Sequence, residues 1–129
     1  MTSRSGSTLY LSGHLPIPTS GGLIVGKVGE AVTPEEAQAA ARWCALNIVS
    51  TLKAELGDLD KVKKIHKLVG FVNCVDTFTA QPMVINGASD FFVELFGDKG
   101  VHARSAVGTN ALPLNVPVEI EAIVEIEED

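Results

Sequence analysis

Residues 100–126 read GVHARSAVGTNALPLNVPVEIEAIVEI and contain two stretches with the pattern of β-strands, joined by a loop with two prolines. In the second stretch apolar and acidic residues alternate, and only Ile123 interrupts the acidic side. Successive side chains of a strand point to opposite faces, so this alternation predicts a strand with one buried face. The residues predicted to point inward are Val118, Ile120, Ala122, Val124 and Ile126.

The first stretch, residues 101–108, carries a single arginine among small residues. Arg104 shares one predicted face with His102 and Ala106. The planar guanidinium suits a carboxylate, which can come from a ligand or from the protein itself. We expect the loop to form a hairpin that brings Arg104 close to Glu119. A carboxylate-binding site and a cross-strand ion pair on an exposed sheet face both fit this spacing.

Two helices are predicted in the middle of the chain. Residues 33–36, Thr-Pro-Glu-Glu, form a capping box with proline at the first helical position. An apolar stripe then predicts a helix over residues 34–56, ended by Gly57. Pro82 opens a second helix that ends at Gly97, and Gly87 inside it would allow close packing against the sheet. The residues predicted to face the core are Val84, Ile85, Ala88, Phe91, Phe92 and Leu95.

A long strand is predicted over residues 62–74. Apolar residues occupy both of its faces, as is typical of a central strand. The expected faces are Ile65, Val69 and Phe71 on one side, and Leu68 and Val72 on the other. A short strand is expected over residues 8–12 and another is possible over residues 23–28, while residues 1–7 read as a flexible lead-in. The order predicts one α+β domain over residues 1–129, a sheet with two helices on one face.

Composition argues against several classes of function. The net charge is −6, with acid gathered at the C-terminus, so a nucleic-acid partner is not expected. The lysines at 61–67 read as the solvated side of a strand. No stretch approaches the roughly 18 apolar residues of a membrane span, and no residue set has metal-ligand or cofactor-binding spacing. Cys44 and Cys74 read as free thiols, which fits a reducing, cytoplasmic compartment.

Three motifs together resemble a known family. HARSAVG at 102–108, ALPL at 111–114 and VEIEAI at 118–123 are similar to the C-terminal signature of the reactive intermediate deaminase (Rid) or YjgF-like family, also labelled L-PSP endoribonuclease. The resemblance reaches back to Tyr10, and the segments at 40–47 and 68–73 look like a divergent branch. It implies a chorismate-mutase-like fold and a homotrimer with ligand sites in the clefts between subunits.

The resemblance also implies roles for particular residues. Arg104 matches the arginine that grips the substrate carboxylate, and Glu119 matches the glutamate that orients or activates water. Further matches to the ligand pocket are Ser12, Gly13, Asn86 and Ala106. Ala106 stands where many members have cysteine, so a pocket thiol is absent. Family members also carry an additional N-terminal strand and a pocket aromatic residue, for which we expect no counterpart here; either the chain is short or its start is truncated.

Three functions follow from the resemblance. The first is a metal-free and cofactor-free deaminase that hydrolyses 2-aminoacrylate-type enamines and imines at a subunit interface, with Arg104 and Glu119 as catalytic residues. The second is a non-catalytic trimer that holds a small carboxylic acid for binding or regulation. The third is an endoribonuclease, which the acidic charge disfavours. Whether the chain is an enzyme is left open by its sequence.

Overall fold

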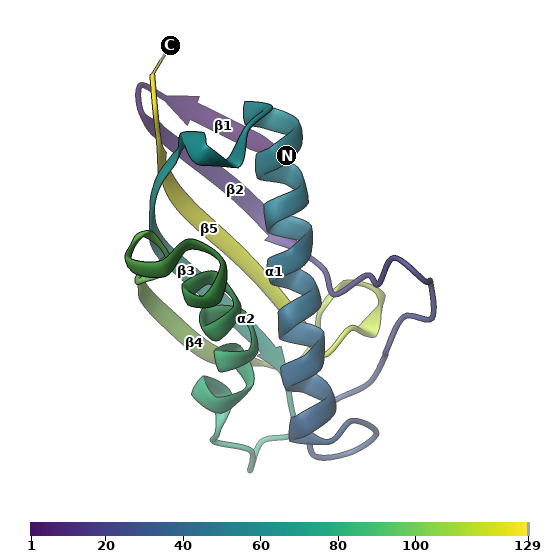
Figure 1. The fold of residues 1–129 in the computed structure, drawn as a ribbon. Coiled ribbons are helices and arrows are strands. Elements are labelled where there is room, and N and C mark those ends of the chain that lie inside the picture. The colour runs from purple at the N-terminus through teal and green to yellow at the C-terminus, as the bar shows by residue number, and fades with distance from the viewer. Residues whose placement is uncertain (129) are drawn as a thin grey trace.

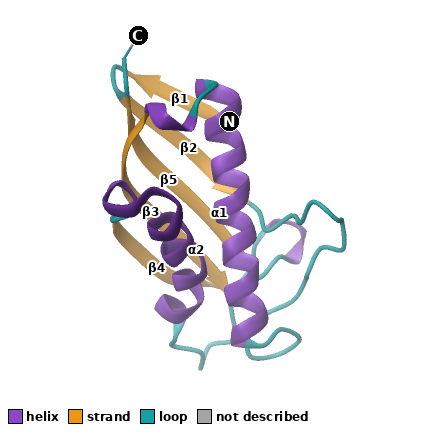
Figure 2. Cartoon of the chain, in the orientation of Figure 1, coloured by secondary structure: helices purple, strands orange, loops and turns teal. Residues whose placement is uncertain are grey.

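The structure, a computed structural model that describes residues 1–128, has two long helices lying across one face of a five-stranded sheet (Figure 1). Helices, strands and the long connecting loops are distinguished in Figure 2. The strands and helices are β1 (Thr2–Ser5), β2 (Thr8–His14), α1 (Pro34–Leu56), β3 (Val62–Asn73), α2 (Gln81–Phe96), β4 (Ala103–Thr109) and β5 (Val118–Ile126). Short 3-10 helices are η1 (Leu59–Lys61), η2 (Gly97–Gly100) and η3 (Pro113–Asn115). The predicted α+β architecture, with both helices on one face, is confirmed.

The strand order in the sheet is β1-β2-β5-β3-β4. All neighbouring strands are antiparallel except β3 and β4, which are parallel. The predicted hairpin of residues 101–126 is therefore wrong, because β3 lies between β4 and β5. Helix α2 connects β3 to β4 as a crossover, and such a connection places the two strands parallel. The local patterns of the last two strands carry no signal that an earlier strand lies between them.

The inward face of β5 forms the centre of the core, as its alternation predicts. Four of its five predicted inward residues have no exposed surface and Ala122 is 3% exposed. They pack beneath the helices, with α1 over β2 and β5 and α2 over β3 and β4. Among residues 1–128 no helix is both long enough and apolar enough to span a membrane.

Strand β3 has one buried face and one partly exposed face, but one residue lies opposite to its predicted side. Ile65 is fully buried on the helix side together with Leu68 and Val72. The pairing with β5 shifts between Ile65 and Lys67, as at a β-bulge. A bulge inserts one residue into the pleat and reverses the faces beyond it, which strict alternation does not anticipate.

Helix α1 begins and ends as its sequence predicts. The Thr33 hydroxyl accepts a hydrogen bond from the Glu36 N–H at 3.1 Å, and the Glu36 carboxylate accepts one from the Thr33 N–H at 3.0 Å. Gly57 follows the last turn with a φ of 80°, a conformation that favours glycine. The capping box and the glycine together fix the length of the helix that covers the centre of the sheet.

Helix α2 packs against α1 as well as the sheet. Val84, Ile85, Ala88 and Phe92 are buried as predicted, whereas Leu95 is 46% exposed and does not belong to the core. Gly87 was expected to face the sheet, but a Cβ at this position would collide with the backbone carbonyl of Gln38 on α1. The glycine therefore permits a close contact between the two helices.

The N-terminal segment differs from its prediction. Thr2–Ser5 forms β1 and pairs with β2, so this part of residues 1–7 is not a flexible lead-in and an additional N-terminal strand is present. Residues 23–28 form no strand; Val28 makes only isolated bridges to Val32 and Cys74. Strand β1 pairs with a strand that is close to it in the sequence. Because β1 is polar throughout, it lacks the alternation of apolar and polar residues that predicts a strand.

The close contact at Gly87 predicts a large effect of a small substitution. Gly87→Ala should lower the free energy of unfolding by about 1–3 kcal/mol, because the added methyl must push the helices apart. Alanine normally favours a helix over glycine, so the sign itself tests the contact. Ser50→Ala, at an exposed position of α1, should change stability by less than about 0.5 kcal/mol. Urea unfolding measures both; a stabilised Gly87→Ala protein would contradict this packing.

Candidate functional site

Arg104 lies on the helix-covered face of the sheet, on the edge strand β4. Its cross-strand neighbour on β3 is Leu68, which in turn pairs with Ala122 on β5. Both of these neighbours are buried beneath the helices. Because paired residues of adjacent strands point to the same face, Arg104 points toward α2, where its guanidinium reaches a hydroxyl group.

Three side chains form a hydrogen-bonded row beneath α2. Arg104 Nη1 donates to Ser89 Oγ at 3.1 Å, and Ser89 Oγ lies 2.9 Å from His102 Nε2. His102 Nδ1 lies 2.6 Å from the Gly100 carbonyl oxygen. We call Arg104, Ser89 and His102 the arginine row. All three side chains are partly buried.

The sequence pattern places His102 on the same strand face as Arg104 but does not single out Ser89. The signals were present: His102 is two residues from Arg104 on the same strand face, and Ser89 is three residues beyond Asn86 on one face of α2. What the sequence does not show is that the crossover places α2 over β4. Asn86 itself is partly buried, and Ala106 packs against the core from the same side as Arg104.

Glu119 lies on the opposite face of the sheet, which no helix covers. Glu119 pairs with Phe71 on β3, and Phe71 in turn pairs with Val107 on β4. Gly13 is next to it, since a Cβ on Gly13 would come within 2.7 Å of Glu119 Cδ. The strand pairing of β2 shifts between Leu11 and His14, so Ser12 and Gly13 lie in an irregular segment. We call Ser12, Gly13 and Glu119 the glutamate group.

The environment of Glu119 favours its protonated form. Partial burial raises the pKa of this carboxyl, and the negative charge of Glu121 raises it further. A carboxyl with a raised pKa can exchange protons closer to neutral pH than an ordinary glutamate. The raised pKa of Glu119 is a shift in the direction that proton transfer near neutral pH requires.

The predicted proximity of Arg104 and Glu119 within one chain is wrong. A third strand separates their strands, and the two side chains point to opposite faces. The cross-strand ion pair is excluded for the same reason. The arginine row and the glutamate group cannot contact one small ligand within a single subunit.

Two hollows flank the glutamate group. One of about 520 Å³ is lined by Ser12, Gly13, His14, Asn47 and Thr51, among others. His14 is fixed there by Ser12 O at 2.6 Å and Thr51 Oγ1 at 2.8 Å. Burial lowers the pKa of His14. The hydrogen bond to Ser12 O acts in the opposite direction, but its effect on the pKa is smaller.

The second hollow, of about 620 Å³, lies on the uncovered face of the sheet. Its lining includes Tyr10, Lys67, Val69, Glu121 and Ile123. Tyr10 is 47% exposed and Val107 on the same face is 44% exposed. Phe71, Val107 and Ile123 also lie on this uncovered face, whereas Leu68 faces the helices.

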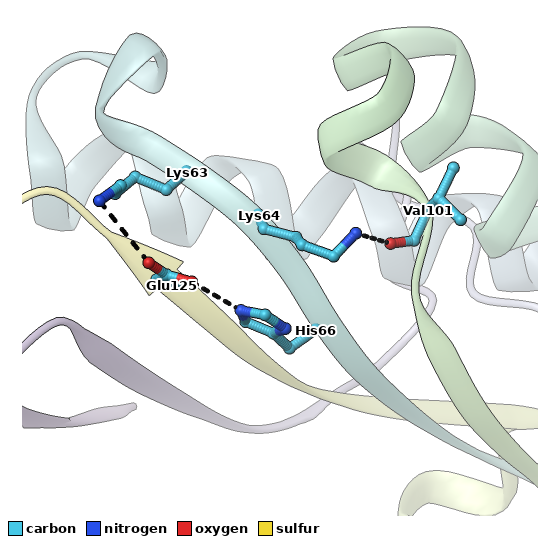
Figure 3. A network of polar contacts seen from close by, with 5 residues as sticks. All are labelled: Lys63, Lys64, His66, Val101 and Glu125. Atoms are coloured by element: carbon cyan, nitrogen blue, oxygen red, sulfur yellow. Dashed lines mark hydrogen bonds and ion pairs between the residues drawn. The ribbon is translucent and has the colours of Figure 1, made fainter.

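Two lysines of β3, Lys63 and Lys64, make local contacts (Figure 3). Glu125 accepts from His66 Nε2 at 2.8 Å and lies 3.7 Å from Lys63 Nζ. Lys64 Nζ donates to the Val101 carbonyl at 2.6 Å. The hydrogen bond from His66 lowers the pKa of Glu125. Within residues 1–128, no group of three or more His, Cys, Asp or Glu side chains could hold a metal ion.

The family described as "YjgF/chorismate_mutase-like, putative endoribonuclease" matches residues 2–126. The chain belongs to the YjgF family. Protein TCP17 of Trypanosoma cruzi is 50% identical over 95% of this chain and 77% of its own length. A "Putative regulator AldR" of Lactococcus lactis is 34% identical over 92% of this chain and 79% of its own length.

Several solved structures share the fold of this chain. Atu1372 of Agrobacterium tumefaciens superposes with a TM-score of 0.95 at 47% identity, covering 98% of this chain and 80% of that one. A "putative endoribonuclease" of Shewanella oneidensis gives 0.93 at 33% identity, over 97% and 83%. RidA of Psychrobacter gives 0.64 at 28% identity, over 97% and 85%. The family match begins at Thr2 and therefore includes β1.

The raised pKa of Glu119 in this YjgF-family chain can be measured directly. Removing the charge of Glu121 with Glu121→Gln should lower the pKa of Glu119, because the repulsion that disfavours its ionised form is gone. Carboxyl-carbon NMR over pH 3–8 would follow both variants. Glu127→Gln, an exposed change at the C-terminal end of the sheet, should leave Glu119 unaffected. An unchanged Glu119 in Glu121→Gln would show that the two carboxylates are not coupled.

Proposed function

We propose that this protein is an enamine/imine deaminase whose active site forms between subunits of a homotrimer. In this proposal the arginine row of one subunit faces the glutamate group of the next. The observation that supports it most strongly is the placement of Arg104 and Glu119 on opposite faces of one sheet. Only a second chain can bring both groups to one small substrate.

Each half of the proposed site supplies what the reaction requires. The substrate class is a small 2-aminoacrylate-type enamine with a carboxylate. Arg104 holds this carboxylate through its planar fork of donors. The enamine then tautomerises to an imine, and water adds to the imine carbon before ammonia leaves. Glu119, whose pKa is raised by burial, positions the water and carries the proton.

The uncovered sheet face supports the assembly. Phe71, Val107 and Ile123 are apolar residues on a face that neither helix covers, and Tyr10 next to them is nearly half exposed. Contiguous exposed apolar surfaces of this kind usually meet a partner. A closed ring of three chains would present this face to identical neighbours.

A non-catalytic role remains the second candidate. Ala106 lacks the thiol that the family resemblance expects at that position, and the name of the Lactococcus relative describes it as a regulator. A trimer that only binds a small carboxylic acid would use Arg104 in the same way. Ribonuclease activity is the description attached to the family and several neighbours, but the net charge of −6 works against binding a polyanion.

Mixed subunits test the proposed site. Arg104→Ala and Glu119→Gln should each abolish ammonia release from freshly generated 2-aminoacrylate. Co-expressed in equal amounts, the two variants should recover about a quarter of wild-type activity, because one interface in four then pairs an intact Arg104 with an intact Glu119. Light scattering should report about three times the chain mass for every sample.

The outcomes separate the candidates. A site within one chain would give no recovery in the mixture. A clean monomer at micromolar concentration would remove shared sites altogether. If wild-type protein released no ammonia but bound pyruvate in a manner that Arg104→Ala abolishes, the non-catalytic role would replace the deaminase. The double variant Arg104→Ala/Glu119→Gln, expressed alone, is the matched control for residual activity.

A further inference from the structure

Ser89 and His102 lie next to Arg104. Both are polar, and the proposed deaminase reaction assigns no role to either of them. Their hydrogen bonds fix where each proton lies. The Gly100 carbonyl can only accept, so His102 Nδ1 must carry a proton. In the neutral imidazole Nε2 is then an acceptor, and Ser89 donates its hydroxyl proton to it. The lone pairs of Ser89 Oγ remain for Arg104 Nη1.

Neutral His102 is the form that this environment favours. Burial lowers the pKa of His102, the hydrogen bond to Gly100 opposes this, and the charges of Arg104 and Lys64 lower it further. Lys64 is held nearby through the carbonyl of Val101, the residue before His102 (Figure 3). From α2, the side chains against the imidazole are the uncharged Ser89 and Phe92, the latter in an edge-on contact with ring centroids 6.2 Å apart.

Other charged residues of the neighbouring elements point elsewhere. Asp90 and Glu94 on α2 are exposed, and Glu94 forms an ion pair with Arg42 of α1 at 3.7 Å. Asp98 and Lys99 on η2 are also exposed. The charges acting on His102 are therefore cationic, so an anion bound beside it would reverse the local balance.

We propose that Ser89 and His102 complete the carboxylate site of Arg104: when a carboxylate binds, His102 takes up one proton at Nε2 and Ser89 turns its hydroxyl from the imidazole to the ligand. The proton comes from solvent, and no covalent bond changes. Protonated His102 donates to Ser89 Oγ, which frees the hydroxyl proton for the carboxylate. The ligand then receives Ser89 O–H in addition to guanidinium N–H groups, and His102 acts as a positioning residue.

The proposal rests on the assignment of Arg104 as a carboxylate site, and it adds a pH dependence to that site. Binding coupled to the uptake of one proton strengthens as pH falls toward the range where His102 protonates. The affinity for a carboxylate should therefore rise between pH 8 and pH 6, by at most about tenfold per pH unit for a single proton. A guanidinium acting alone would show no such slope, because it stays charged throughout.

Calorimetric titration with pyruvate is the experiment. Titrations at the same pH in two buffers with different ionisation heats, neither of them an anion that competes for Arg104, give a difference that counts the protons taken up. Wild-type protein should take up a fraction of a proton near pH 7, and its dissociation constant should rise with pH. His102→Gln should remove both effects while still binding, since the amide N–H can donate to Ser89. Ser89→Ala should weaken binding several-fold.

Controls distinguish the groups that could take up the proton. His66→Gln, at an exposed imidazole paired with Glu125 on the other face, should retain the wild-type uptake. Pyruvate binding that requires Arg104 but shows no proton uptake would overturn this proposal and leave the proposed function standing. Uptake that persists in His102→Gln would assign the proton to another group, such as Glu119. Absence of any pyruvate binding would overturn both.

A ligand-free measurement tests the same coupling independently. In Arg104→Gln the pKa of His102, followed by NMR of its ring, should rise because a neighbouring positive charge is lost. The matched change Arg42→Gln removes an exposed cation from α1 and should leave the His102 titration where it is. An identical His102 pKa in wild type and Arg104→Gln would show that the arginine row is not coupled, and the proposal would fail.

Discussion

Burial of the inward face of β5 beneath α1 and α2 is the constraint on which the other features depend. Each fully buried valine or isoleucine contributes about 1.5–3 kcal/mol relative to an exposed one, and β5 supplies four of them at the centre of the sheet. The register of β5 cannot slip by one residue without exposing all of them. The same constraint fixes Glu119 on the uncovered face, and the pairing through β3 fixes Arg104 on the covered one.

This division separates Arg104 from Glu119 within one chain. On the covered side, the crossover helix α2 brings Ser89 to Arg104 and His102, so a guanidinium is held at the edge of the sheet by a polar row. On the uncovered side, the irregular end of β2 places Gly13 against Glu119, where a larger residue would displace the carboxylate. Each half is preorganised by its own packing, which is the condition for low-cost positioning of a small substrate.

The sequence predicts those features that arise from local patterns. The alternation of β5, the capping box of α1 and the glycine stops of both helices all appear in the structure because they depend on neighbouring residues alone. The partnership of β4 could not be predicted in this way, since it depends on β3 inserting between two strands that follow each other in sequence. The bulge after Ile65 also depends on pairing with another strand, and it places Ile65 on the face opposite to the predicted one. The polar strand β1 has no alternation from which it could be predicted.

The residues of the candidate site show the same limit. Arg104 and Glu119 could be selected from residue type and family resemblance. That they point to opposite faces of the sheet depends on the register of β3 with both β4 and β5, which the sequence does not show. Ser89 and His102 become neighbours only when α2 folds over β4. The chemistry of these side chains can be read from the sequence, whereas the face of the sheet on which each lies depends on the sheet topology.

A crystal structure of the assembled protein with bound pyruvate tests the central claim most directly. The carboxylate is expected within hydrogen-bond distance of Arg104 and Ser89 of one subunit, with Gly13 and Glu119 contributed by a neighbouring subunit. Pyruvate bound at Arg104 of one chain and open to solvent, with no second chain within reach, would contradict a shared site.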